Sequence, residues 1–165
     1  MIREAQMDDI AAIADVHCRT WKEAYKNIVH DSYLKKLEPK YEEVRSRMEN
    51  PDRKFFVMVP PSSDGNPVGA FIEAGKSRNV GFADAQIHSI YILPRYQKQG
   101  VGKALMDKAW DLFAERVYRT AFVSVLSANA SAVEFYKKMG GQLNGHDRVV
   151  IEGISYLTDT YFWHI

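Results

Sequence analysis

Two glycines and three glutamine or lysine side chains lie together at the centre of the chain, in the run Gln97-Lys98-Gln99-Gly100-Val101-Gly102. A β-branched and aromatic run, Gln86 to Leu93, precedes this turn and ends at Pro94, which predicts a strand. Apolar residues then recur at helical spacing, which predicts an amphipathic helix from Lys103 to Tyr118. The turn therefore leads into a helix start, where backbone N–H groups lack partners and the helix dipole is positive. Glycines let an anion approach these N–H groups, and the lysines add positive charge, so we predict a phosphate-binding turn.

Two common phosphate-binding motifs do not fit this turn. The Walker A motif would need glycine at Gln97 and serine or threonine at Ala104. The dinucleotide fingerprint would need a third glycine at Leu105. The remaining pattern, [QR]-x-x-G-x-[GA] between a strand and a helix, resembles the acyl-CoA pyrophosphate loop of the GNAT acetyltransferases.

A second motif resembles the same family. The run Asn129-Ala130-x-Ala132-x-x-Phe135-Tyr136-x-x-Met139-Gly140 is similar to the N-x-x-A-x-x-F-Y-x-x-x-G-F block that follows the fifth strand in GNAT enzymes. Gly141 stands where the family has its last phenylalanine. The two motifs cover Gln86 to Gly141 in the order and spacing of the family, and Trp21 to Tyr25 resembles the opening helix of many small bacterial members.

The resemblance implies an α/β fold, with a mixed, mostly antiparallel splayed sheet of six to seven strands flanked by helices. No repeat or linker divides the chain, so we expect residues 1–165 to form a single acyl-CoA N-acyltransferase domain. In that fold the fourth and fifth strands diverge, and the pantetheine arm of acetyl-CoA or coenzyme A enters the gap between them. The two closing strands are predicted at Val149–Glu152 and Ile154–Trp163, joined near Gly153.

The resemblance also implies roles for individual residues. The N–H of Ile90 matches the donor to the thioester oxygen, and such a donor is typically worth ~2.7–4 kcal/mol in acyl transfer. Tyr136 matches the general acid that reprotonates the leaving thiolate. The implied cofactor-binding residues are Ile90, Tyr91, Ile92, Gln97, Lys98, Gln99, Gly100, Val101, Gly102, Lys103, Asn129 and Tyr136.

The residues themselves leave alternatives open for two of these roles. By its helical pattern alone, Tyr136 is a core aromatic on the face of Ala132 and Met139, and only the family motif favours a catalytic role. Asn129 either caps the helix or turns the loop, or it hydrogen-bonds the cofactor or the acceptor.

The general base is where the chain departs from many relatives, which carry glutamate at the position of Gln86. A carboxamide does not accept a proton as a carboxylate does. Asp84, Glu73 and His88 are the nearby candidates, each with a structural role as its alternative. A chain of water molecules without a dedicated base is a further alternative.

The acceptor is expected to be a primary amine on a small molecule, peptide or protein. The implied substrate-binding residues are Trp21, Tyr25, Tyr33, Gln86 and His88. Aromatic rings suit a cationic amine through cation–π contact, but packing is the alternative, above all for Trp163. Two other functions stay open: a catalytically weak acyl-CoA-binding module, and a nucleotide-binding protein that uses the same turn.

Composition narrows the class of protein. A formal net charge of +1 argues against a nucleic-acid partner, which would need a basic face. The single cysteine, Cys18, excludes an internal disulfide framework and fits a reducing cytoplasm. Adjacent helical residues do not face each other, so His17 and Cys18 predict no metal site. With no apolar run of membrane length and no signal-peptide core, we expect a cytoplasmic protein without membrane attachment. The resemblance also allows a homodimer through the closing strands.

Overall fold

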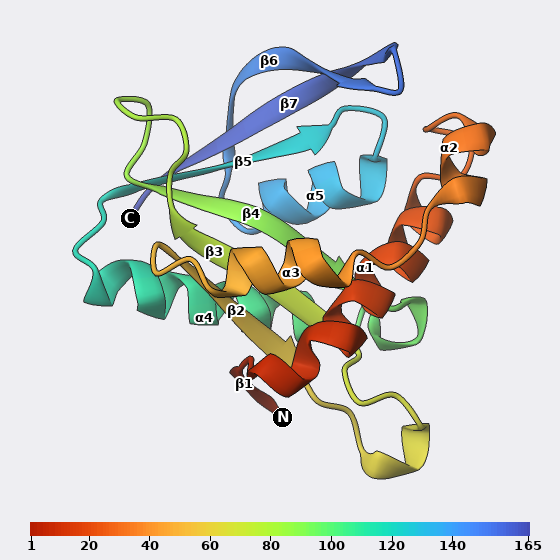
Figure 1. Cartoon of the computed structure of the whole chain (residues 1–165). Helices are drawn as coiled ribbons and strands as arrows, with labels where there is room; N and C mark the ends of the chain where they lie inside the picture. Colours follow the sequence, from red (N-terminus) through yellow and green to blue (C-terminus); the bar gives the residue numbers. More distant parts are fainter.

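One mixed sheet of seven strands runs through the protein in the order β1-β2-β3-β4-β5-β7-β6 (Figure 1). The computed structural model describes residues 1–165, except the side chain of Ser63. All neighbouring strands are antiparallel apart from β4 and β5, which are parallel. The predicted mixed, mostly antiparallel α/β fold is therefore confirmed. The strands are β1 Ile2–Glu4, β2 Arg53–Met58, β3 Ala70–Lys76, β4 Ala85–Ile92, β5 Thr120–Leu126, β6 Gln142–Ile151 and β7 Ile154–His164.

Helices cover both faces of the sheet. α1 Ile10–Ala24 and α3 Tyr41–Met48 lie on one face, and α4 Val101–Glu115 and α5 Ala130–Lys138 lie on the other (Figure 1). The short helix α2 Asp31–Lys36 lies near the free end of the β6–β7 hairpin. Within the described residues, no helix is both long enough and apolar enough to cross a bilayer.

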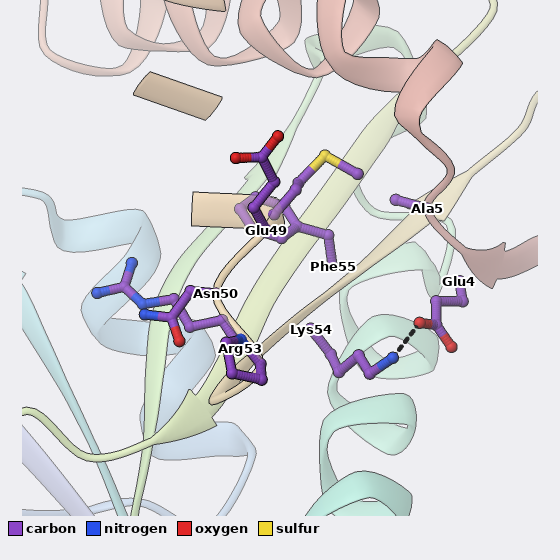
Figure 2. A pocket seen from close by; sticks show the side chains of 9 residues that line it. Glu4, Ala5, Glu49, Asn50, Arg53, Lys54 and Phe55 are labelled. Atoms are coloured by element: carbon purple, nitrogen blue, oxygen red, sulfur yellow. Dashed lines mark hydrogen bonds and ion pairs between the residues drawn. The ribbon is translucent and has the colours of Figure 1, made fainter. Parts of the chain in front are cut away.

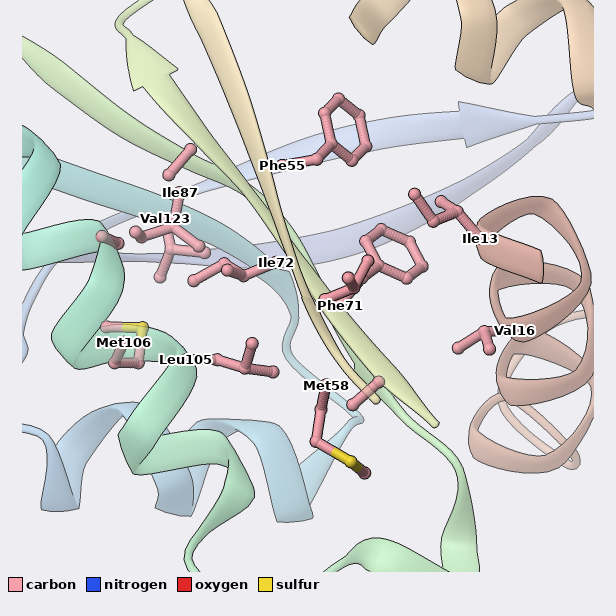
Figure 3. Close-up of a cluster of buried hydrophobic side chains, with 14 of the residues drawn as sticks. Ile13, Val16, Phe55, Met58, Phe71, Ile72, Ile87, Leu105, Met106 and Val123 are labelled. Carbon is pink, nitrogen blue, oxygen red and sulfur yellow. The ribbon is translucent and has the colours of Figure 1, made fainter. Parts of the chain in front are cut away.

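The core is formed where side chains from both layers meet the central strands. Ile13 of α1 packs toward Phe71 on one side of β3, while Leu105 of α4 packs toward Ile72 on the other (Figure 3). All four side chains are fully buried. Successive residues of a strand point to opposite faces, so the uninterrupted apolar run of β3 serves both layers at once.

Helix α4 starts and ends earlier than predicted. It begins at Val101, directly after Gly100, whose φ of +81° is the left-handed conformation that glycine adopts without strain. It ends at Glu115, and Val117 with a φ of +57° turns the chain away from the helix axis. The predicted helix of residues 103–118 was therefore placed two to three residues too late.

Strand β6 is longer than predicted. It runs from Gln142 rather than from Val149, and it pairs along its length with β7. Nearly all of its side chains are exposed, because β6 is the edge strand of the sheet. Neither face of β6 is buried, so residues 142–148 carry no alternating apolar pattern that would mark them as a strand.

Candidate active site

The start of helix α4 presents a row of backbone N–H groups without partners. Ala104 is the first residue whose N–H bonds back into the helix, to the carbonyl of Gly100 at 3.0 Å. Within the described chain, no acceptor is bonded to the N–H groups of residues 99–103. The helix is 15 residues long, so its dipole adds partial positive charge at this end. The predicted phosphate turn thus has the donors that a pyrophosphate requires.

The two glycines of this turn serve different purposes. Gly100 faces open space, since a Cβ built there would meet nothing within 4 Å. Gly102 is buried, and a Cβ there would lie 2.9 Å from Cε2 of Phe135 and 3.3 Å from Cδ1 of Ile92. Gly100 therefore supplies the left-handed bend and ligand access, whereas Gly102 lets α4 approach α5 and β4 closely.

The side chains around the turn hold it in place and add charge. The carboxamide of Gln97 donates to the carbonyl of Ile92 at 2.9 Å, which ties the turn to the end of β4. Lys98 has a φ of +58° and an exposed side chain. Lys103 is also exposed and pairs with Asp107 one helical turn later at 2.8 Å. The ammonium of Lys103 is thus drawn toward Asp107, and the ammonium of Lys98 has no carboxylate partner among the described residues.

Strands β4 and β5 separate soon after they begin. Their pairing covers only Ala85 with Ala121 and Gln86 with Phe122. On its other edge, β4 continues to pair with β3 up to Ile92, with one extra residue, His88, between the partners of Ala74 and Glu73. This extra residue is a β-bulge. Beyond it, the segment from Ser89 to Ile92 borders a widening gap on the β5 side (Figure 1).

Tyr136 projects from α5 into the core beside this gap. Its side chain is 5% exposed, and its ring lies 6.4 Å from that of Tyr161 and 6.2 Å from that of Trp163. Burial raises the pKa of Tyr136, and the neighbouring Tyr25 hydroxyl raises it further. Burial likewise raises the pKa of Tyr91 on β4, with added contributions from Tyr25 and Tyr136. The three tyrosine hydroxyls therefore lie near one another, and each keeps its proton at neutral pH.

Asn129 acts as a helix cap. Its side-chain oxygen accepts a hydrogen bond from the N–H of Ala132 at 3.2 Å, at the start of α5. The capping alternative is thus confirmed, and a contact with a ligand stays a prediction. By fixing the first turn of α5, Asn129 also fixes the position of Tyr136 two turns later.

Three of the five predicted substrate-binding residues lie together. The rings of Tyr25 and Tyr33 lie 4.4 Å and 6.0 Å from that of Trp21. The Trp21 indole donates to the hydroxyl of Tyr91 at 2.8 Å, which links α1 to β4. His17, one turn earlier on α1, lies 5.1 Å from the Tyr91 ring. These aromatic side chains form a wall on the α1 side of the gap.

Gln86 and His88 lie away from that wall, nearer the start of β4. His88 precedes Tyr91 by three residues, roughly 10 Å along a strand. The carboxamide oxygen of Gln86 accepts from the N–H of Arg78 at 3.3 Å, so it closes the turn between β3 and β4. Nε2 of His88 lies 3.2 Å from the carbonyl of Lys76. A carbonyl accepts only, so Nε2 carries the proton, and the buried Nδ1 is an acceptor with no partner among the described residues.

Glu73, a candidate base, is held in a buried ion-pair network. Its carboxylate is fully buried and accepts from Arg47 of α3 at 3.0 Å, from Arg53 of β2, and from the hydroxyl of Ser89 at 3.3 Å. A carboxylate with these three donors has a structural role and no open position toward the gap. Sequence reasoning identified the acid but missed both arginines, because they lie on other elements, 26 and 20 residues away along the chain.

Asp84, the other carboxylate candidate, joins β4 to β5. It accepts from the N–H of Arg119 at 2.8 Å and from the N–H of Thr120 at 3.2 Å. These bonds to backbone N–H groups lower the pKa of Asp84. Its position is where the two strands still run together, so it holds the closed end of the gap and does not face the open end.

Two hollows lie outside the α4 turn. One, of about 230 Å³, is lined by residues of β1, β2 and the end of α3, including the hydrogen-bonded pair Lys54 and Glu4 (Figure 2). It contains none of the predicted site residues. The other, of about 270 Å³, lies over β5 and β7 on the α1 and α3 side of the sheet, and its lining comprises Asn79, Phe82, Phe122, Ser124, Asn144, Gly145, His146, Asp147 and Thr160.

A sheet that opens between β4 and β5, with a helix start free to bind phosphate beside the opening, defines the acetyltransferase class of fold. The model of the acetyltransferase (GNAT) family matches residues 17–141, and the chain belongs to this family. The N-acetyltransferase YuaI of Bacillus subtilis (strain 168) is 30% identical over 155 residues, covering 93% of this chain and 86% of that protein. Streptothricin acetyltransferase of Streptomyces lavendulae is 30% identical over 105 residues, covering 64% of this chain and 53% of that protein.

Solved structures agree on the fold. The PaiA N-acetyltransferase from Thermoplasma acidophilum in complex with coenzyme A superposes with a TM-score of 0.73 at 20% identity, covering 96% of each chain. A GCN5-related N-acetyltransferase from Rhodopseudomonas palustris gives a TM-score of 0.79 at 16% identity, covering 100% of this chain and 95% of that one. At these identities the likeness shows the fold alone.

Proposed function

We propose that residues 1–165 form one acyl-CoA N-acyltransferase domain, which moves the acetyl group of acetyl-CoA to a primary amine by direct attack on the thioester. The acceptor amine belongs to a small molecule, a peptide or a protein. The observation that supports this most strongly is the row of partnerless N–H groups at the start of α4, beside the gap between β4 and β5. Family membership supports it independently.

The residues around the gap fit acetyl-CoA as the acyl donor. The N–H groups of residues 99–103, with Lys98 and Lys103, would hold the pyrophosphate. Backbone groups of Ile90, Tyr91 and Ile92 would pair with the pantetheine arm as an added strand, because β5 leaves that edge of β4. When bound there, the ligand supplies an activated acyl group as a thioester. The N–H of Ile90 then stabilises the negative charge that develops on the thioester oxygen.

Tyr136 is the group that would return a proton to the departing thiolate as the carbon–sulfur bond breaks. Burial raises the pKa of Tyr136, so the proton is present at neutral pH. The same desolvation would raise the pKa of the thiol that leaves into this gap. The pKa values of the Tyr136 hydroxyl and of the thiol therefore shift in the same direction. The ammonium proton of the acceptor would leave through water, because Glu73 and Asp84 are both engaged in structural bonds and burial lowers the pKa of His88 to about 3, which makes its ring a weak base.

A coenzyme A release assay with a panel of amines tests this function. We expect Tyr136→Phe to lower kcat by about 100-fold or more, as for loss of a general acid, with an unchanged Kd for coenzyme A. Tyr161→Phe is the matched control, because it removes a hydroxyl from the adjacent buried ring and should leave kcat within about twofold of the wild type. Equal kcat for Tyr136→Phe and the wild type would exclude the acid role.

Many relatives carry a glutamate base at the position of Gln86. The absence of that carboxylate favours a second candidate function, in which the protein binds acyl-CoA but catalyses little or no transfer. A catalytically weak acyl-CoA-binding module would bind coenzyme A tightly and release no thiol with any amine. A nucleotide-binding protein would instead let ATP or NAD compete with coenzyme A. Competition titrations of coenzyme A with ATP and NAD, together with the coenzyme A release assay, distinguish the acetyltransferase, the acyl-CoA-binding module and the nucleotide-binding protein.

A further inference from the structure

Positive charge exceeds negative charge on the α3 side of β4, next to the proposed reaction centre. Arg47, Arg53 and Arg78 approach the start of β4 there, and Glu73 is the carboxylate among them. Glu73 is fully used, since one oxygen accepts from Arg47 and the other from Arg53. Below, these three arginines and Glu73 are called the arginine cluster.

Arg78 is the member of the arginine cluster with no partner. Its N–H donates to Gln86, which fixes its backbone beside β4, but its guanidinium makes no hydrogen bond or ion pair with any described residue. Partial burial, together with the nearby Arg53 and Arg47, lowers the pKa of Arg78. Guanidinium groups that crowd one another in this way attract an anion.

Two nitrogen atoms of this region are buried and lack a hydrogen-bond partner, whereas the Arg78 side chain is exposed to solvent. Nε of Arg47 is a donor and Nδ1 of His88 an acceptor, and neither has a partner among the described residues. Burial, followed by the charges of Arg53, Arg78 and Arg47, lowers the pKa of His88 to about 3, so its ring is neutral. Buried polar atoms of native proteins are seldom left unbonded, which suggests that a ligand with both acceptor and donor groups completes this region.

The arginine cluster is accessible and close to the reaction centre. The Arg78 side chain is exposed, and that of Arg47 is 23% exposed. Asn79, the residue after Arg78, lines the hollow of about 270 Å³ over β5 and β7. Ser89, which bonds Glu73, directly precedes Ile90, and Gln86, which accepts from the N–H of Arg78, lies four residues before Ile90, roughly 13 Å along a strand that the long Arg78 side chain can partly bridge. One small molecule can therefore span both.

We propose that the acceptor carries a carboxylate as well as its amine, and that Arg78, with Arg47 behind it, binds this carboxylate while the amine lies at Ile90. This assignment rests on the proposed function and narrows its acceptor to amino acids and peptides with a free carboxylate at that distance. Guanidinium groups suit it because they bind both oxygens of a carboxylate in one plane.

The test compares amines that differ only in this charge. A set of amino acids and dipeptides is assayed with acetyl-CoA beside the corresponding carboxamides, with the wild type, Arg78→Gln and Arg45→Gln. Arg45 lies two residues before Arg47 but has an exposed side chain on α3, so its variant is a matched loss of charge. Melting temperatures confirm that all three proteins are folded.

We expect turnover to favour the carboxylates. Arg78→Gln should raise KM for the carboxylate substrates by about 10- to 100-fold, as for loss of a hydrogen bond between charged groups, while kcat changes little. The KM of the carboxamides and of acetyl-CoA should stay the same, and Arg45→Gln should resemble the wild type. Equal use of carboxylates and carboxamides, or an equal effect of Arg78→Gln on both, would overturn the proposal.

A binding experiment separates this proposal from the proposed function. N-acetyl amino acids, N-acetyl dipeptides and their carboxamides are titrated into the protein saturated with coenzyme A, and the heat of binding is measured. Absence of turnover with every amine would count against the enzyme, yet tighter binding of the carboxylates, lost in Arg78→Gln, would still support the site. Absent or equal binding of the two sets would overturn the site even if amines are acetylated.

Discussion

The two sides of the gap between β4 and β5 are built in different ways. The phosphate side is one contiguous segment, residues 97–103, whose N–H groups need only the local backbone to point at a ligand. The acceptor side is assembled from α1, α3, β2, β3 and β4, and a fully buried carboxylate holds part of it together. Changes on the first side should therefore weaken ligand binding in a folded protein, whereas changes on the second should first weaken the fold.

The largest effect is expected for Glu73→Gln. This change removes the buried charge that pairs with Arg47 and Arg53, and loss of one partner from such a network typically costs about 3–5 kcal/mol. Urea unfolding should show this loss in the free energy of unfolding. Glu43→Gln, which affects an exposed pair with Lys40 at 3.8 Å, should cost less than about 1 kcal/mol. Equal stability of Glu73→Gln and Glu43→Gln would contradict the view that the buried carboxylate holds the acceptor side together.

A smaller effect is expected on the phosphate side, for Gly100→Asp compared with Gly100→Asn. Both side chains have room at this position, and both tolerate the left-handed conformation better than most residues. Only aspartate places a negative charge against the pyrophosphate, so calorimetry should give a coenzyme A Kd at least about tenfold higher than for asparagine. Added salt should narrow the difference. The melting temperatures should match, and a fold lost in the aspartate variant alone would show that the two sides are not separable.

A third effect concerns acidification of the acceptor side. Burial lowers the pKa of His17 to about 4 and of His88 to about 3, whereas an unfolded histidine titrates near 6.5. The unfolded chain therefore takes up these protons first, so stability should be full above pH 6.5 and should fall as the pH drops toward about 4. Urea midpoints at pH 7.5 and pH 5 measure this fall. His88→Gln should reduce this loss of stability between pH 7.5 and pH 5, and His164→Gln, at an exposed position, should leave it unchanged.

Sequence alone predicted the local structure of the phosphate side well because its signals are local, and ligand binding there stays a prediction. Glycine spacing, the strand that Pro94 stops and the helical periodicity all lie within some thirty residues, and the structure moved only the ends of the helix. The asparagine cap of α5 was equally local. The resemblance to a family then supplied the splayed sheet, which no spacing of residues could reveal.

The acceptor side was predicted in part. The aromatic residues do gather: Trp21 and Tyr25 lie one helical turn apart at the end of α1, and the packing of α2 brings Tyr33 against Trp21. Gln86 and His88 were grouped with them but lie farther along β4. Arg47 and Arg78 could not be connected to Glu73 from the sequence, because only the packing of α3 and of the connection between β3 and β4 against the sheet brings them together.

Gly141, where the family motif has phenylalanine, is explained by Trp163. A Cβ at Gly141 would lie 2.8 Å from the Trp163 indole, which donates to the carbonyl of Met139 at 3.0 Å and contacts the Trp110 ring at 5.4 Å. The three tryptophans thus divide into Trp21 on the α1 side of the sheet and a coupled pair on the α4 side. Their ultraviolet emission gives the protein an intrinsic optical reporter: after Trp21→Phe, the remaining fluorescence comes from the α4 side of the sheet, where Trp163 lies 6.2 Å from the Tyr136 ring.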